Sequence, residues 1–493
     1  MTAKIDDIGS DSKKSLEKRG SRRFIILLVS FFFLSFIHAG FLSYNCGYVA
    51  MSELITSPLY NEETFSVNRS MIPWNADHLS LSDRRFDFTP EEKGWSFAAG
   101  FAGAMFGVPI LGLMTAKWGM HRMMSGMGAM IAVTCFLLPY LVSISFPLFL
   151  FLRFLSGTAL AILFAAAGHV VSYWAPLNER GLWIAVLSGH VEFSPFFSMP
   201  HAGLVGSEIS WPAIYYSHGV IALLVTILWI FVHKDDPRDV KWLKKEELDR
   251  VMQGKFELLN AKREKQKPVS FLKLIKTPVV VGIWVACIGY YFGVQFSITF
   301  SLLYYSSALH YSPIVCGFVT MIPLLILLFL KLVTGHISDR LTSIREVTRM
   351  RIFNSIALIG SAFFFLIASF RQPDGSWMDV AVVVMPVCIL GCHSGGYPKC
   401  AVIVARKHSA AVFSYMQLFG CGSLVAGAFM VPMLTPSGEH AEWGIVFRAY
   451  AVVMLVCNLV FCYTATDKPC EWALEKETTE VEISTSENQT HKV

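Results

Sequence analysis

Residues 24–51, FIILLVSFFFLSFIHAGFLSYNCGYVAM, form a long apolar run that contains no Asp, Glu, Lys or Arg. A helix needs about 20 mostly apolar residues to cross the hydrocarbon core of a bilayer. The run is too long for the apolar region of a cleavable signal peptide, so it predicts a transmembrane helix. The chain of 493 residues has the same character throughout, with 54% hydrophobic and 16% charged residues. Soluble domains carry about 25% charged residues, so the composition predicts a membrane protein.

Eleven further runs are long and apolar enough to cross a membrane. The fold we expect is an all-α membrane protein with twelve transmembrane helices in two six-helix bundles. The bundles span 24–232 and 278–463, joined by a basic linker at 233–277 and flanked by tails at 1–23 and 464–493. Two such halves with a site between them near the midplane are typical of alternating-access transporters. The twelve expected spans are 24–51, 93–114, 123–142, 146–171, 182–205, 211–232, 278–305, 313–335, 352–370, 380–402, 410–434 and 445–463.

The distribution of Lys and Arg predicts the orientation. Seven lie in the tail 1–23, thirteen in the linker 233–277 and four in the loop 336–351, all on one side if the spans alternate. Cytosolic loops carry the excess of basic residues, so both termini are expected in the cytosol. The polar segment 52–92 then lies on the outer face, and its Asn68 begins an Asn-Arg-Ser sequon that we expect to be glycosylated. A second sequon at Asn488 falls in the cytosolic acidic tail and should stay unmodified.

The motifs of enzymes and metal sites are missing from the sequence. Most of the 11 cysteines lie in apolar runs, where they behave as small hydrophobic residues, and no CxxC pair occurs. No P-loop or HExxH motif is found, so we expect neither an enzyme nor a cofactor or bound metal. The basic residues follow the membrane topology, which argues against nucleic acid as a partner. The expected partners are lipid and a small anionic solute, and the chain is expected to be monomeric.

Two charged residues are expected deep in the membrane. At about 1.5 Å per residue, Arg153 lies roughly 10 Å below the outer face and Glu192 roughly 15 Å from the inner face. A charge at mid-bilayer costs at least about 2.5–3.5 kcal/mol and usually faces a cavity or pathway. The guanidinium of Arg153 suits a carboxylate or phosphate, so it is a candidate anion-binding residue. Glu192 is a candidate for ion coupling. The alternative is a structural ion pair between the two.

The pattern of small residues after Arg153 predicts a helix face that a ligand or a neighbouring helix can approach closely. Small side chains recur at steps of four and three residues on the side of Arg153, at Gly157, Ala161, Ala165 and Gly168. Glu179 and Arg180 follow the span in a cytosolic loop. They belong either to a gating charge network or to a solvated loop.

Further polar residues of the spans are assigned more than one role. Histidines 38, 190 and 393 are candidate proton carriers, because imidazole titrates near neutrality, or else packing residues. Tyr290 and Tyr291 lie near mid-membrane, and with Gln295 and His393 they are candidate substrate contacts; His38 is also assigned to coupling. Three other charges lie near the interfaces and are expected to be anchors, namely Lys331, Lys399 and Arg448.

Several short motifs, taken in their order, resemble the major facilitator superfamily and, within it, the organic-anion/phosphate symporter family. The loop GLMTAKWGMHR at 112–122 is similar to the loop between helices 2 and 3 of the superfamily, and GHISDRL at 335–341 to its second-half counterpart. The others are WAPLNERG at 174–181, MPHAG at 199–203, DDP at 235–237 and KPCEWA at 468–473. The resemblance covers the chain from the first span to the C-terminal tail. It implies gating roles for charges in these loops, namely Lys117, Arg122, Glu179, Arg180, Asp339 and Arg340.

The resemblance also implies an anion-binding role for Arg153, which matches the family's helix-4 arginine. Leu160 stands where the glutamate-transporting relatives have a Glu, and Gly289, Tyr290 and Tyr291 stand where they have an Arg. His169 is displaced by one residue from a family histidine, so no role is carried over to it. Glutamate is therefore not the expected substrate.

These observations predict a secondary transporter of an organic anion or phosphate, coupled to a proton or sodium gradient. The alternatives are a transporter-like receptor or sensor, and a carrier of a neutral solute. A plasma membrane and an endolysosomal or vesicular membrane are equally compatible with the sequence.

Overall fold

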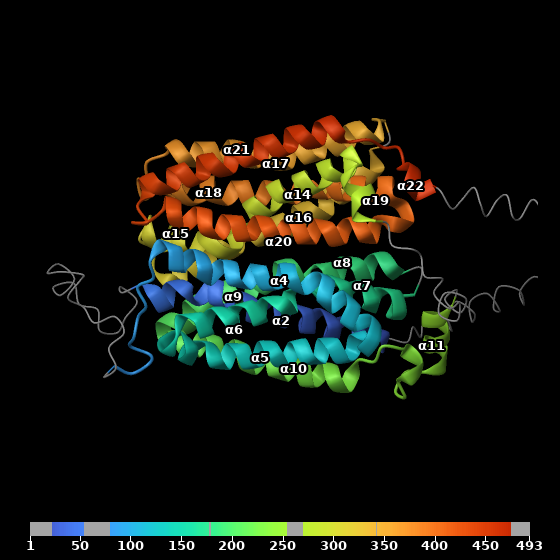
Figure 1. Ribbon diagram of the computed structural model, residues 1–493, viewed down its shortest axis with the longest axis horizontal. Helices are drawn as coiled ribbons and strands as arrows, with labels where there is room; N and C mark the ends of the chain where they lie inside the picture. Colours follow the sequence, from blue (N-terminus) through green and yellow to red (C-terminus); the bar gives the residue numbers. More distant parts are fainter. Residues whose placement is uncertain (1–21, 54–78, 177–178, 254–269, 342, 475–493) are drawn as a thin grey trace, which may run out of the picture.

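A computed structural model describes residues 22–53, 79–176, 179–253, 270–341 and 343–474. Asn68 and Asn488 lie outside the described residues, so their glycosylation stays a prediction. The described chain forms two groups of roughly parallel helices, one from each half of the sequence, which Figure 1 shows one above the other.

The described part of the first half contains eight helical segments. Two of its expected spans are interrupted: that at 146–171 at Ala161–Ile162, and that at 182–205 at Gly189. The segments are α2 (Arg23–Ser52), α4 (Pro90–Trp118), α5 (Met120–Ile144), α6 (Phe146–Leu160), α7 (Leu163–Trp174), α8 (Arg180–Ser188), α9 (His190–Glu208) and α10 (Trp211–Val232).

The second half repeats this arrangement with its own interruptions. Its first long helix contains a short π-helix, a rare form that is frequent at functional sites. The segments are α14 (Pro278–Gln295), η5 (Phe296–Phe300), α15 (Ser301–Ser307), α16 (Pro313–Arg340), α17 (Glu346–Phe370), α18 (Trp377–Leu390), η6 (Gly391–Gly395), α19 (Tyr397–Ala405), α20 (Ser409–Leu434) and α21 (His440–Thr464). Short helices lie in the connections, namely η4 (Pro237–Asp239), α11 (Lys245–Met252), α13 (Phe271–Ile275) and η7 (Arg406–His408), and α22 (Glu471–Leu474) follows α21.

Eleven helical runs among the described residues are long and apolar enough to cross a membrane. The run at 182–205 is the exception, because its longer helix, α9, contains His190, Glu192 and two prolines. It still packs as its neighbours do, between α2 and α16. The all-α fold predicted from the sequence is confirmed.

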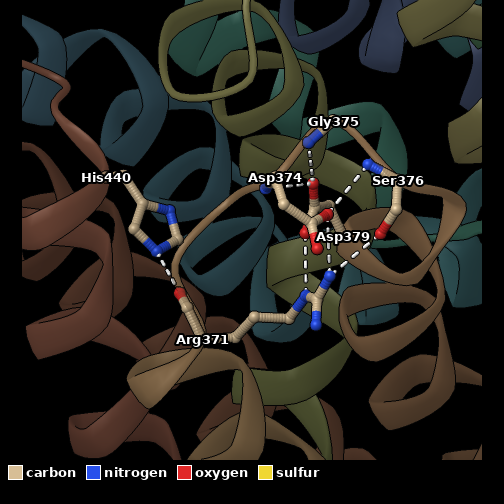
Figure 2. Close-up of polar contacts among 6 residues, drawn as sticks. All are labelled: Arg371, Asp374, Gly375, Ser376, Asp379 and His440. Atoms are coloured by element: carbon tan, nitrogen blue, oxygen red, sulfur yellow. Dashed lines mark hydrogen bonds and ion pairs between the residues drawn. The ribbon is translucent and has the colours of Figure 1, made fainter.

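The two ends of the helices can be told apart by what lies there. We call the end with Arg23 and α11 the linker end, and the end with Ser52 and Leu434 the distal end. At the distal end a tight loop joins α17 to α18 (Figure 2): Arg371 donates to Asp379 over 2.8 Å, and Asp379 accepts from two backbone N–H groups. Hydrogen bonds from Ser376, aided by Arg371, lower the pKa of Asp374 to about 2. This loop lies beside His440, whose ring contacts the Arg371 carbonyl oxygen.

The two halves touch mainly through two helix pairs, α4 with α20 and α9 with α16. At the α9–α16 crossing a Cβ added to Gly203 would lie 2.6 Å from the Pro313 carbonyl oxygen, and one added to Gly317 would lie 2.6 Å from that of Met199. The backbones approach so closely because neither glycine has a side chain. At the α4–α20 contact, the Trp95 ring meets the Phe429 ring edge-on at 4.9 Å. These contacts lie in the distal part of the helices, so the halves are closed against each other there.

Candidate functional site

A cavity of about 80 Å³ lies between the two halves. Tyr290 in its wall is twelve residues from the start of α14, or about 18 Å along the helix, which places the cavity near mid-membrane. Four helices from both halves supply the polar part of the wall, with His38, His190, Glu192, Tyr290, Tyr291 and Gln417. The structure thus brings together five of the residues singled out from the sequence: His38, His190, Glu192, Tyr290 and Tyr291. Gln417 was not singled out from the sequence, because a lone Gln in an apolar run has no distinguishing pattern.

An ion pair joins the halves beside this cavity. The Lys331 Nζ on α16 lies 2.8 Å from the Glu192 Oε1 on α9. The Glu192 side chain is 4% exposed and that of Lys331 is 26% exposed. The other carboxylate oxygen of Glu192 has no hydrogen-bond partner among the described residues. Of the ion pairs between described residues, this is the one that links the two bundles.

The expectation that Lys331 is an interfacial anchor is wrong. The helix was expected to end at 335 but continues to Arg340, so Lys331 lies nine residues, or about 13 Å, inside its end. Lys399 also lies inside its helix, and it pairs with Asp339 and Glu346 at 2.8 and 2.9 Å. Arg448 is exposed near the distal start of α21, as expected.

Arg153 is buried in the first bundle, with 1% of its surface exposed. Its guanidinium group lies over the rings of Tyr44 and Phe41, at 4.3 and 5.1 Å from their centroids. It donates hydrogen bonds of 3.3–3.4 Å to the carbonyl oxygens of Ser96 and Phe41 and to the Asn45 Oδ1. Among the described residues no carboxylate pairs with it. The alternative of an Arg153–Glu192 ion pair is therefore wrong for this conformation, since Glu192 pairs with Lys331.

Two neighbours of Arg153 connect it to the cavity and to the second bundle. Phe41, on which the guanidinium lies, is part of the cavity wall. Asn45, which accepts from Arg153, donates in turn to the Thr299 Oγ1 at 3.1 Å in the π-helix η5. This chain of contacts crosses from one bundle to the other on the distal side of the cavity. A cation that pairs with no carboxylate in the described part of the chain thus lies directly behind the cavity wall.

Two predicted substrate contacts are not in the cavity wall. The Gln295 amide donates to the Leu424 carbonyl oxygen at 2.6 Å and ties α14 to α20 within the second bundle. His393 lies behind Tyr290, with a ring-centroid distance of 4.1 Å, and its Nδ1 contacts the Leu390 carbonyl oxygen. Sequence position placed both at a suitable depth, but the rotation of a helix about its axis decides which side a residue faces.

The predicted gating residue Glu179 belongs to a charge network at the linker end of the first bundle. It pairs with Arg23 at 2.9 Å and with Arg250 at 3.6 Å, and Arg23 also meets Glu247 at 3.5 Å. The network ties the start of α2 to the linker helix α11. The side chain of Arg180 lies outside what the structure describes.

A second network lies at the linker end of the other bundle. Lys399 holds Asp339 and Glu346, and Glu346 also contacts Arg349. Three further predicted gating residues are exposed and make no ion pair with another described residue: Lys117, Arg122 and Arg340. Each network stays within its half and the adjoining linker in this conformation.

A histidine cluster lies near the linker end of α5, α7 and α10. The Asp235 carboxylate accepts from the His121 backbone N–H at 2.8 Å and lies 3.2 Å from the His169 ring nitrogen. Burial raises the pKa of Asp235, but the His169 contact and this hydrogen bond outweigh it and hold the pKa below its usual range. Burial also lowers the pKa of His233, whose ring stacks on Trp229 at 3.8 Å, to about 3. Asp235 thus places an acid at the loop 112–122, which lacks one of its own.

This architecture, two bundles of apolar helices with a cavity between them whose mainly apolar wall carries a few polar side chains, is that of a multi-pass membrane transporter. The sequence matches the profile of the Major Facilitator Superfamily over residues 64–428, and the chain belongs to this superfamily.

Curated relatives of this chain include sialin and proteins named as phosphate transporters. Sialin from Ovis aries is 21% identical over 458 residues, which are 92% of this chain and 91% of sialin. Sodium-dependent phosphate transport protein 1 from Mus musculus is 20% identical, over 80% of this chain and 84% of that protein. A putative inorganic phosphate cotransporter from Drosophila melanogaster is 23% identical, over 77% and 73%. The resemblance to the organic-anion/phosphate family is confirmed.

Solved structures show the same fold. A bacterial homologue of the human lysosomal transporter Spinster, inward-facing and occupied, matches with a TM-score of 0.65 at 12% identity, covering 92% of this chain and 99% of that one. The inward-open xylose transporter XylE from E. coli matches with a TM-score of 0.62 at 14% identity, over 92% and 98%.

Proposed function

We propose that this protein is a secondary active transporter that moves an organic anion or phosphate by alternating access, driven by a proton or sodium gradient. The observation that carries the proposal is Arg153, a buried guanidinium group that has no carboxylate partner among the described residues and lies directly behind the wall of the cavity between the bundles. An uncompensated charge in the membrane interior is costly, and an anion in the cavity would balance it. The names of sialin and of the phosphate transport proteins are in line with an anionic solute.

The proposal includes an orientation. The linker end carries the basic segments of the sequence and is assigned to the cytosol, with both termini there. The distal contacts at Trp95–Phe429, Gly203 and Gly317 then close the outer side. On this assignment transport requires these contacts to open while the linker-end charge networks approach each other.

The test is uptake by proteoliposomes that contain the purified protein. The panel of labelled solutes comprises inorganic phosphate, sugar carboxylates, monocarboxylates, amino acids and a neutral sugar, each with an imposed pH or sodium gradient. The proposal expects one class of anion to accumulate above its equilibrium level with one of the two gradients. Accumulation of the neutral sugar alone, or of no solute, would refute it.

A further inference from the structure

We propose that Lys331 is a second anion-binding residue which Glu192 masks, and that a proton on Glu192 releases it for the substrate. The inference rests on the transport function proposed above and deepens it, since it assigns the proton as the coupling ion. It starts from the ion pair between the bundles, which the sequence did not predict.

The geometry allows a proton to bind Glu192 and Lys331 to turn from Glu192 to a solute. Lys331 contacts the Glu192 Oε1 at 2.8 Å, whereas the Oε2 atom is buried and has no hydrogen-bond partner among the described residues. Glu192 lines the central cavity and also an apolar crevice of about 380 Å³ between α2, α8–α9 and α16. Glu192 therefore lies at the border of the two cavities, with Lys331 next to it. A proton can bind Oε2 without displacing another partner, and the more exposed ammonium group can turn toward a solute.

The charges around the cavity make proton and anion binding interdependent. The groups near Glu192 are His38 on α2, His190 on α9, Tyr290 on α14, Lys331 on α16 and, behind Tyr290, His393 on η6. Phenol and imidazole groups add no negative charge at neutral pH. Glu192 is thus the carboxylate that faces Lys331.

Protonation of Glu192 leaves two cations, Lys331 and Arg153, without an anion in a region of low dielectric constant. An anion that enters the cavity restores the balance, so each binding event favours the other, and the coupling is reciprocal. Protonation without anion adds a positive charge to the site, and an anion without the proton meets the ionised Glu192 while Lys331 stays paired with it, so each is bound more tightly with the other present, as symport requires.

The proton step is simple. Water on the open side gives a proton to Oε2, the carboxyl group becomes neutral, and Lys331 keeps its ammonium charge while its bond to Oε1 weakens. When the anion leaves on the other side, the ammonium group returns to Glu192 and the proton is released to water. No covalent bond of the solute changes.

Variants of the two residues separate this role from a structural ion pair. The probe is glucuronate, or the carboxylate that the uptake panel identifies, because its carboxyl group stays ionised from about pH 5 to 8. In Glu192→Gln we expect anion exchange to persist with a KM that no longer depends on pH, and accumulation driven by a pH gradient to be lost. In Lys331→Met the KM should rise at least about tenfold at every pH, whereas Lys331→Arg should stay within a few-fold of the wild type. Arg448→Met, an exposed residue of α21, is the matched control.

The double variant Glu192→Gln with Lys331→Met decides between the two roles. The proposal expects its KM to be as high as that of Lys331→Met. If both single variants lose thermal stability, and the double variant regains stability and the wild-type KM, the pair is structural and the proposal is overturned.

A measurement on the wild type does not depend on the folding of any variant. Protein in weakly buffered detergent solution is mixed with the same carboxylate, and a pH-indicator dye reports protons taken up. We expect about one proton per anion bound, and an affinity that rises up to about tenfold per pH unit as the pH falls. Binding without proton uptake, or accumulation driven by sodium at constant pH, overturns this inference and leaves the anion transporter standing. A wild type that takes up no anion refutes the proposed function instead.

Discussion

A single added methyl group at the crossing of α9 and α16 should open the distal side of the protein. A Cβ on Gly317 would lie 2.6 Å from the Met199 carbonyl oxygen and 3.1 Å from the Pro200 Cα, both of them backbone atoms that cannot turn aside. Ordinary contact begins at 3.4 Å, so Gly317→Ala must separate the two helices by about 0.8 Å. Overpacking of this kind costs about 1–3 kcal/mol. Because the contact belongs to the distally closed conformation, that cost shifts the population toward the distally open one by roughly 5- to 150-fold.

The assay is the accessibility of Thr299, which is 3% exposed and meets Asn45 across the bundle contact. Thr299→Cys is labelled with a membrane-impermeant thiol reagent added to the distal side, with and without Gly317→Ala. The control is Gly126→Ala on α5, where an added Cβ has no other atom within 4 Å. We expect faster labelling with Gly317→Ala and an unchanged rate with Gly126→Ala. Equal rates in all three backgrounds would refute the closed distal contact as a gate.

Three further predictions concern other parts of the molecule. Asn68→Gln should increase electrophoretic mobility and Asn488→Gln should not, and the reverse would contradict the orientation. His233 has a pKa of about 3 when folded, below its unfolded value of about 6.5, so the unfolded state binds more protons between these values and the stability of the protein falls as the pH drops. Thermal unfolding scans from pH 7 to 5 should show a smaller loss of stability for His233→Phe than for the wild type. Equal losses would contradict the buried neutral imidazole. Asp379→Ala removes the acceptor of Arg371 and of two backbone N–H groups. The loss should cost about 1.5–3 kcal/mol of stability and lower the melting temperature by several degrees. An unchanged melting temperature would show that the distal loop does not depend on Asp379.

The course of the chain through the membrane could be predicted from the sequence because hydrocarbon imposes it. Apolar runs such as 24–51 must form helices that satisfy their own backbone hydrogen bonds, and their number and lengths fix the fold class. The depth of Arg153 and Glu192 followed from the same arithmetic.

The pairing of the charges could not be predicted, because it depends on helix ends and helix rotation. Lys331 was misplaced since α16 continues past 335 to Arg340, where polar residues remain helical beyond the apolar run. Gln295 has the right depth but faces α20. The acid at the loop 112–122 is Asp235, which lies more than a hundred residues later in the sequence. Such contacts depend on how distant helices pack, which one sequence does not specify.

The most direct test of the anion-transport account is uptake by proteoliposomes that contain Arg153 variants. Arg153→Met loses two ring contacts and three long hydrogen bonds, but it also removes an unbalanced charge that costs at least about 2.5–3.5 kcal/mol. Since these effects oppose each other, the melting temperature should change by a few degrees at most. The account predicts that Arg153→Met is folded but takes up no anion, and that Arg153→Lys keeps transport with a KM raised about tenfold or more, because the planar fork is lost. A folded Arg153→Met variant that accumulates the anion as the wild type does would contradict the account.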